Sequence, residues 1–126
     1  LSNKMKLWRR LGLVARAMEL QGPQEGLLLR LMDAAGKRSR VLANNLANQN
    51  TPGYRRQVVR FEELLGAALE RGENDLSAIQ PAVVSDFDTK SRTDGNNVVP
   101  ELEKSASQEN RVLAESYLTL LEGHYR

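Results

Sequence analysis

Cysteine is absent from this sequence of 126 residues, histidine occurs once, and only six residues are aromatic. A chain without cysteine has no disulfide framework and no thiolate for catalysis. The single histidine, His124, cannot build a metal site alone, and no cluster of Asp and Glu has the spacing of a hard-cation site. Gly36-Lys37 lacks the earlier glycine of a phosphate-binding loop, because position 31 is leucine. These absences predict a protein that is not an enzyme and holds no cofactor or metal.

Long hydrophobic runs are also missing. No stretch approaches the roughly 18 apolar residues of a transmembrane helix, and no short apolar segment with a cleavage site indicates Sec-type export. Leu, Val, Ile and Phe together make up 32 of the 126 residues, which is enough for folding but thin for a globular core. Long helices that each bury one apolar stripe fit this composition best.

The net charge is small, but the charged residues are unevenly distributed along the chain. The net charge is +2, yet residues 1–60 hold twelve Lys and Arg against three acids, whereas residues 61–126 hold six against thirteen. This asymmetry is typical of a basic membrane- or nucleic-acid-associated adaptor, or of two complementary surfaces that meet within or between subunits. Nucleic acid is the weaker partner, because the acidic half would repel phosphate and no aromatics are interleaved with the basic residues.

The first segment, residues 1–22, is predicted to be a basic amphipathic N-terminal extension. Its apolar residues recur at three- and four-residue steps, which is typical of a helix. Three interpretations remain open: a helix on an anionic membrane surface, an export signal, or a solvated, partly ordered extension. If the protein contacts a membrane, we expect it to do so only through this segment. The predicted stripe consists of Leu1, Met5, Trp8, Leu11, Ala15 and Met18.

The rest of the chain divides into three segments. Residues 23–50 are predicted to form a long helix, residues 51–99 a turn, a short helix and a polar connector, and residues 100–126 a second long helix. Within the middle segment, residues 55–61 are expected to be extended, residues 61–71 helical and residues 82–84 a brief strand. The fold class is therefore mainly α, with two long helices pairing as an antiparallel coiled coil around a polar, partly extended middle.

The pairing of the two long helices is predicted to rest on an apolar seam. Charge is expected to set its orientation, since exposed ion pairs contribute only about 0.2–1 kcal/mol each. The seam residues are Leu28, Leu31, Ala35 and Leu42 on the first helix and Leu102, Ala106, Leu113, Tyr117 and Leu120 on the second. The expected charge pairs join Arg30, Lys37, Arg38 and Arg40 to Glu103, Glu109 and Glu115.

Residues 41–54, VLANNLANQNTPGY, are the most informative stretch. They crowd four asparagines, which are mediocre helix formers, into seven positions at the end of a helical pattern. Pro52 and Gly53 then predict a sharp turn that presents Tyr54. Two interpretations stay open: the polar residues cap their own helix, or they contact a neighbouring subunit. The predicted contact residues are Asn44, Asn45, Asn48, Thr51, Pro52, Gly53 and Tyr54.

Two motifs in the chain resemble those of a known family. The pattern Ala-Asn-x-x-Ala-Asn-x-x-Thr-Pro-Gly-Tyr, formed by residues 43–54, resembles the N-terminal signature of bacterial flagellar rod and hook proteins. Asp-Gly-Asn-Asn-Val at residues 94–98, just before the last helix, resembles the proximal-rod proteins of the FlgB type within that family. The resemblance extends over residues 24–126, so the basic extension lies outside it.

This resemblance implies a structural subunit of the proximal rod in the flagellar basal body. Proteins of the family associate helically into a periplasmic rod that transmits motor rotation, and they leave the cell through the flagellar export apparatus without a cleaved Sec signal. The implied partners are copies of the chain, other rod proteins, the adapter between rod and membrane ring, and the export apparatus. No nucleic acid and no cofactor are implied.

Overall fold

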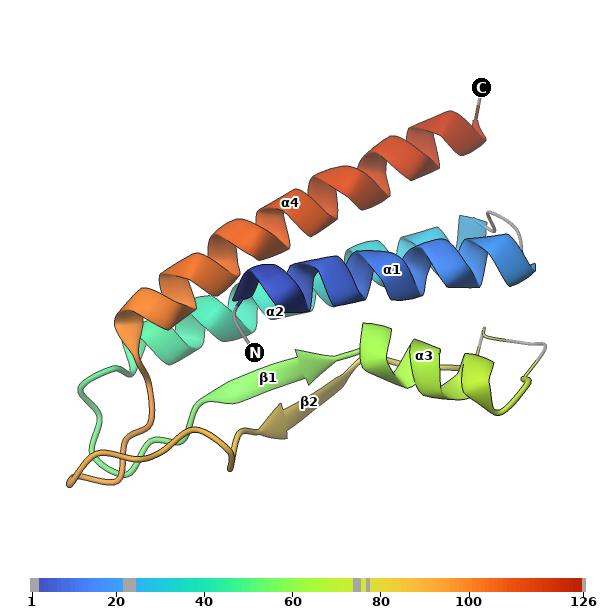
Figure 1. Ribbon diagram of the computed structural model, residues 1–126. Helices are drawn as coiled ribbons and strands as arrows, with labels where there is room; N and C mark the ends of the chain where they lie inside the picture. The colour runs from blue at the N-terminus through green and yellow to red at the C-terminus, as the bar shows by residue number, and fades with distance from the viewer. Residues whose placement is uncertain (1–2, 22–24, 74–75, 77, 126) are drawn as a thin grey trace.

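The computed structural model describes residues 3–21, 25–73, 76 and 78–125. In chain order, these residues form α1 (Asn3–Gln21), α2 (Glu25–Ala47), β1 (Gln57–Arg60), α3 (Glu62–Glu70), β2 (Ala82–Ser85) and α4 (Pro100–His124). Figure 1 shows α4 above α1 and α2, with α3 and the two strands below them. The predicted mainly α fold class is confirmed. The predicted break at Gly22 and Pro23, and Leu1 of the predicted stripe, lie outside the described residues.

The two long helices α2 and α4 pack against each other in antiparallel directions (Figure 1). Asn110, near the middle of α4, donates to the carbonyl oxygen of Ala35 at 2.8 Å. About two turns closer to the start of α4, Glu103 accepts a hydrogen bond from Asn45, near the end of α2. Since later residues of α2 meet earlier residues of α4, the predicted antiparallel pairing is confirmed.

The predicted charge pairs between α2 and α4 are wrong. None of the ion pairs found in the described residues joins Arg30, Lys37, Arg38 or Arg40 to Glu103, Glu109 or Glu115. Arg38 instead turns towards α3 and pairs with Glu62 at 2.5 Å. Glu103 pairs with Arg56, just before β1, also at 2.5 Å. The prediction assumed only two helices, whereas α3 and β1 supply the partners of the buried charges.

Helix α1 packs against α3 and α4, so it is a part of the folded unit. Of the predicted stripe of α1, Leu11 and Met18 pack against the core. Val14 and Ala17 are buried, whereas Met5, Trp8 and Ala15 are exposed. A Cβ atom built on Gly66 of α3 would come within 2.6 Å of a methyl group of Leu13, so the Leu13 side chain of α1 packs directly over the glycine.

The hydrophobic core lies between α1, α2, α3 and α4. Leu28 and Leu31 of α2, Leu65 of α3 and Leu113 of α4 are completely buried, and so is Phe61, which precedes α3. Burial of each such side chain contributes about 1.5–3 kcal/mol relative to exposure. The thin apolar composition is therefore concentrated in one cluster at the α3 end of the molecule.

The middle segment is more ordered than the sequence suggested. β1 and β2 pair antiparallel, with Val58 opposite Val84, and β-branched residues favour such strands. α3 ends at Glu70, and Gly72 turns the chain just after it with a φ of +75°, which suits glycine. The polar composition of the connector also predicted that it has little to bury. This prediction is wrong, because Asp86, Asn96 and Asn97 are buried and form hydrogen bonds with other segments.

Candidate functional site

The asparagine-rich motif ends α2 by bonding its own backbone. The side-chain nitrogen of Asn48 donates to the carbonyl oxygen of Asn44 at 2.9 Å, and the Thr51 hydroxyl donates to Asn48 Oδ1 at 3.1 Å. The backbone amide of Thr51 donates to the carbonyl oxygen of Asn48, which closes the turn. These bonds satisfy groups that a helix end leaves without partners, so local capping is part of the motif's role.

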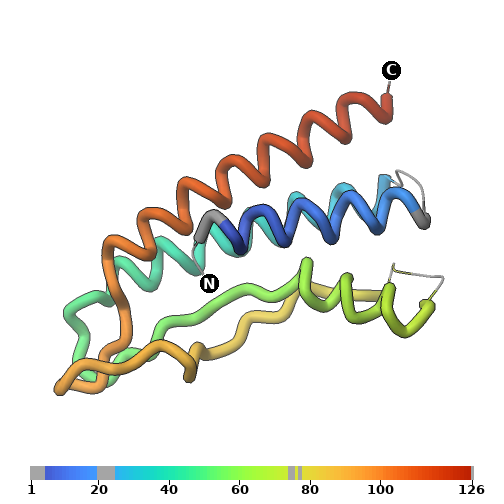
Figure 2. Tube along the Cα trace, viewed as in Figure 1, coloured from blue at the N-terminus to red at the C-terminus, as the bar shows by residue number. Residues whose placement is uncertain are grey.

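The two sequence motifs meet in space, at one end of the molecule. Asn96 is completely buried, and its amide nitrogen donates to the carbonyl oxygens of Asn48 and Thr51 at 2.8 and 2.9 Å. In the opposite direction, the backbone amide of Gly53 donates to the carbonyl oxygen of Asp94 at 2.8 Å. Figure 2 shows the loops before β1 and before α4 coming together at this end. We call residues 48–54 and 92–97 the motif junction.

Two glycines make the motif junction possible. Gly53 and Gly95 have φ angles of +75° and +86°, in the region that disfavours side chains. A Cβ atom on Gly95 would also lie only 3.2 Å from the Cα atom of Gly53. The Thr-Pro-Gly-Tyr and Asp-Gly-Asn-Asn patterns therefore need glycine at both positions, because the two backbones touch there.

Asn45 fastens the motif to the strand that follows it. Its amide nitrogen donates to the carbonyl oxygen of Gln57 at 2.8 Å and to Glu103 at 3.2 Å. Its amide oxygen accepts from the Gln57 backbone amide and from the Tyr54 hydroxyl, both at 2.9 Å. All four hydrogen-bonding positions of this completely buried side chain are filled. Asn45 thus holds α2, β1 and α4 together within one chain.

Arg56 forms the centre of a second polar cluster beside the motif junction. Its guanidinium pairs with Glu103 at 2.5 Å and with Asp86 at 2.7 Å, and its backbone amide donates to Asn97 Oδ1 at 2.6 Å. Burial alone would lower the pKa of Arg56, but the two carboxylates raise it. Burial alone would raise the pKa of Asp86, but hydrogen bonds from Thr89, Arg56 and backbone amides hold it well below its ordinary value.

The lowered pKa of Asp86 predicts a specific pH dependence. A carboxylate with a depressed folded pKa stabilises the fold fully above its unfolded pKa of about 3.9, and this contribution is lost as the pH falls towards the folded value. We expect Asp86→Asn to lower the free energy of unfolding by about 1.5 kcal/mol at neutral pH. The difference from wild type should shrink below about pH 4. Urea unfolding across this range measures it.

Asp88→Asn is the matched control, because Asp88 is an exposed neighbour in the same loop. It should follow wild type at every pH. A gap between Asp86→Asn and wild type that stays constant into strong acid would contradict the assignment.

A third polar cluster lies deep between α2, α3 and α4. Besides its ion pair with Glu62, Arg38 donates to Asn110 Oδ1 at 3.2 Å and to the carbonyl oxygen of Val59 at 3.3 Å. The Tyr117 hydroxyl donates to the other oxygen of Glu62 at 3.2 Å. Burial, and then the neighbouring Glu62 carboxylate, raise the pKa of Tyr117. This cluster fixes the relative placement of three helices.

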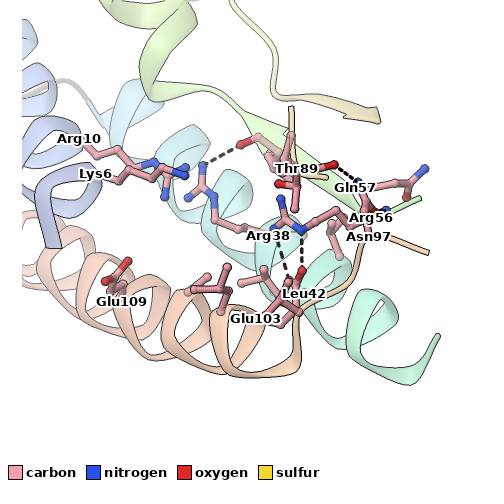
Figure 3. Close-up of a pocket in the computed structure, with 16 residues that line it drawn as sticks. Lys6, Arg10, Arg38, Leu42, Arg56, Gln57, Thr89, Asn97, Glu103 and Glu109 are labelled. Atoms are coloured by element: carbon pink, nitrogen blue, oxygen red, sulfur yellow. Dashed lines mark hydrogen bonds and ion pairs between the residues drawn. The ribbon is translucent and has the colours of Figure 1, made fainter. Parts of the chain in front are cut away.

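A cavity of about 120 Å³ lies between the first half of α1 and the rest of the fold. Figure 3 shows Lys6 and Arg10 approaching it from α1, with Arg38 and Arg56 further in and Glu109 on α4. Burial raises the pKa of Glu109, while Arg10 and Lys6 act in the opposite direction. Arg10 also pairs with Glu63 of α3 at 3.4 Å. The basic first half of the chain thus meets the acidic second half within one subunit.

The charges around this cavity are nearly balanced, since most of the cations already face carboxylates. Among the described residues, no group of three or more His, Cys, Asp or Glu is placed to hold a metal ion. The helices in the part of the chain that the structure describes are also too short or too polar to cross a membrane. The ion pairs beside the cavity join separate elements, as Arg10 of α1 does with Glu63 of α3 and Arg38 of α2 with Glu62 of α3.

The predicted seam residues fall into two groups. Six of them are buried: Leu28, Leu31, Ala35, Leu42, Leu113 and Tyr117. Ala106 is half-buried, whereas Leu102 and Leu120 are 52% and 40% exposed in the single chain. Their burial in a seam stays a prediction about an assembled state.

The predicted contact residues also divide. Asn44, Thr51, Pro52 and Gly53 are exposed, whereas Asn48 and Tyr54 are half-buried. Asn45 is in the interior, so a neighbouring subunit could meet only the other six without rearrangement of the chain. Whether they make such a contact stays a prediction.

The sequence did not predict that Arg56, Glu62 and Asp86 form buried ion pairs, and it predicted the wrong partner for Glu103. One signal was present: Arg38 occupies an apolar position in the stripe of α2, and an arginine there needs a buried partner.

Comparison with known proteins agrees with the two motifs. A family model described as "Flagella basal body rod protein" matches residues 32–55, which run from α2 to just before β1. The chain is 29% identical over 115 residues to the flagellar basal body rod protein FlgB of Borreliella burgdorferi, covering 76% of this chain and 84% of the relative. It is 27% identical over 116 residues to FlgB of Borrelia hermsii, covering 77% and 86%.

These matches support a rod protein of the FlgB type. The residues matched by the family model include the whole asparagine motif and its Thr-Pro-Gly-Tyr turn, which form one half of the motif junction. The proteins that the chain resembles are flagellar basal-body rod proteins, and these matches support a structural rod subunit rather than an enzyme. Nothing favours the alternative of a membrane- or nucleic-acid-associated adaptor.

Proposed function

We propose that this rod subunit belongs to the proximal rod, where copies of it associate helically and transmit motor rotation. The observation that carries the proposal is the pair of motifs joined by Asn96, since this junction is rigidly built yet displays a polar tip. A rod under torque needs subunits whose helices and strands do not slide against one another. The hydrogen bonds of Asn45 and the polar clusters around Arg56 and Arg38 resist such sliding, because each bond has a fixed geometry. The proposed partners are other rod proteins, the membrane-ring adapter and the export apparatus.

The proposed contact surface, called the tip, consists of the exposed residues Asn44, Thr51, Pro52 and Gly53 and the half-buried Asn48 beside them. Asparagine offers donors and acceptors together, so these side chains can bond the backbone of a tightly packed neighbour. Tyr54 supports the tip from behind, because its hydroxyl accepts from Asn44 at 3.0 Å and donates to Asn45. Capping and contact are therefore compatible roles on this surface.

Pro52→Arg tests this contact surface. Pro52 is exposed, so the new side chain adds bulk and charge at the tip without removing a buried group. We expect the free energy of unfolding to change by less than about 1 kcal/mol. In cells that lack the native gene, the variant should be exported but should fail to restore flagella, as counted by electron microscopy.

Gln80→Arg is the control for added charge, because Gln80 is exposed in the loop between α3 and β2, outside the proposed contact surface. It should restore flagella as well as wild type does. If Pro52→Arg restores flagella too, the tip is not a subunit contact. If wild type itself fails to restore them, the assignment to the rod is contradicted.

A further inference from the structure

Arg92 begins the second half of the motif junction, and its backbone closes the turn that carries Asp94 and Gly95. The backbone amide of Arg92 donates to the carbonyl oxygen of Asn96 at 2.8 Å. The backbone amide of Gly95 donates to the carbonyl oxygen of Arg92 at 2.9 Å. These two hydrogen bonds fix the point from which the Arg92 side chain leaves the backbone.

The guanidinium of Arg92 bridges two segments that lie far apart in the sequence. Its Nη2 atom donates to the carbonyl oxygen of Gln49 at 2.6 Å, and its Nη1 atom donates to the carbonyl oxygen of Val98 at 2.8 Å. Gln49 comes two residues after the end of α2, and Val98 comes two residues before the start of α4. One side chain therefore ties the end of α2 to the start of α4.

The chemistry of arginine suits this bridge. Carbonyl oxygens at the C-terminal end of a helix lack partners within the helix, and they favour a positive charge. The planar guanidinium holds its donors at fixed separations, whereas the ammonium group of lysine is a single point charge. The ion pair of Arg92 with Asp94 adds little, because the two groups are 3.7 Å apart and their side chains are 45% and 40% exposed.

Arg92 complements the bonds that Asn96 makes across the motif junction. The amide nitrogen of Asn96 donates to the carbonyl oxygens of Asn48 and Thr51. Arg92 reaches the carbonyl oxygen of Gln49, which lies between them in the chain. Three nearby carbonyl oxygens in the first half of the junction are therefore bound by side chains of its second half.

We propose that Arg92 is a positioning residue of the tip, which it holds in one place relative to the ends of α2 and α4. The inference rests on the proposed function, because the tip is the proposed contact surface. A contact made by short polar side chains needs a fixed backbone, since hydrogen bonds weaken steeply when distance and angle depart from their preferred values. Arg92 acts through the tip and does not itself have to touch the neighbouring copy.

Arg92→Lys tests the bridge, because it keeps the positive charge and removes the two-armed donor. The backbone amide of Gly53 donates to the carbonyl oxygen of Asp94 at 2.8 Å, so its protection from solvent reports whether the two halves of the junction stay together. In the purified chain, we expect this amide to exchange at least about fivefold faster in Arg92→Lys than in wild type, as for loss of one hydrogen bond. Hydrogen exchange followed by NMR spectroscopy measures the rate.

Leu69→Ala separates positioning from stability. Leu69 is buried in the core on α3, at the other end of the molecule from the motif junction (Figure 1). Its truncation leaves a cavity and should lower the stability of the fold more than Arg92→Lys does. The Gly53 amide should nevertheless exchange as in wild type, because the tip opens locally. In cells that lack the native gene, Arg92→Lys should restore fewer flagella than Leu69→Ala, although it is the more stable variant.

Two results would overturn the positioning role. One is a Gly53 amide that exchanges at the wild-type rate in Arg92→Lys. The other is a number of flagella that follows stability, with Leu69→Ala more impaired than Arg92→Lys. Failure of the proposed contact surface has a different sign, because Pro52→Arg would then restore flagella while the exchange rates of the purified chains would be unaffected. If Pro52→Arg abolishes flagella and Arg92→Lys restores them fully, the tip remains a contact and Arg92 has no part in it.

Discussion

Replacing Glu62 by leucine is expected to lower the free energy of unfolding by about 3–5 kcal/mol, because it leaves the Arg38 guanidinium buried without its carboxylate. Glu62 is completely buried, and Arg38 is 4% exposed. The Nε atom of Arg38 already lacks a hydrogen-bond partner, so the site has no spare acceptor for the charge. Urea unfolding followed by circular dichroism measures the loss.

Glu70→Leu is the matched control for this substitution. Glu70 is exposed at the other end of α3, so the same change in side chain should alter the free energy of unfolding by no more than about 0.5 kcal/mol. The double variant Arg38→Met with Glu62→Leu should recover much of the loss, because it removes both charges. A loss below about 1 kcal/mol for Glu62→Leu alone would contradict the buried ion pair.

The two-helix plan of the fold could be predicted because α2 and α4 each carry a long apolar stripe at helical spacing. Both helices were found within three residues of their predicted starts, and the short strand and α3 were found in their predicted segments. Val58, Val59, Val83 and Val84 marked the strands through their β-branched side chains. Local signals of this kind depend on neighbouring residues, which a sequence displays directly.

The orientation of α1 could not be predicted in the same way. Trp8 is the largest apolar residue in α1, and its hydrophobicity drew the predicted stripe towards it. The structure buries Val14 and Ala17 instead. Which face of a helix is covered depends on partner elements that are distant in the sequence, and hydrophobicity alone gives no sign of them.

The partners of the buried charges were hidden for a related reason. Arg38 stood out in the stripe of α2, and Glu103 was expected to pair across the coiled coil. Their partners Glu62 and Arg56 lie on either side of β1, in the middle segment between the two long helices. Periodicity shows which face of a helix is buried, but it cannot show which third element covers that face.

The sequence predicted each half of the motif junction as a turn, but it did not predict the contact between them. Each motif was recognised as a turn, yet nothing in either turn indicated that Asn96 bonds the backbone of the other. The two lie more than forty residues apart in the chain. This contact explains why one chain carries both motifs. The asparagine-rich end of α2 leaves carbonyl oxygens without partners, and the side-chain amide of Asn96 donates to them.

Asn45→Ala is expected to lower the free energy of unfolding by about 3 kcal/mol, the second large effect. The substitution removes four hydrogen bonds and leaves the backbone amide and carbonyl of Gln57 and the Tyr54 hydroxyl without their partner. These groups are partly buried, and an unsatisfied buried polar group is costly. Thermal and urea unfolding of the purified chain measure the change.

Asn50→Ala is the matched control, because it separates the loss of the Asn45 hydrogen bonds from a general effect of replacing asparagine in this motif. Asn50 belongs to the same asparagine run but is exposed, so its replacement should change the free energy of unfolding by no more than about 0.5 kcal/mol. Similar losses for the two variants would mean that asparagine acts through helix propensity alone. A large loss confined to Asn45 would instead establish that one asparagine of the motif holds the subunit together, while its neighbours remain free to meet another chain.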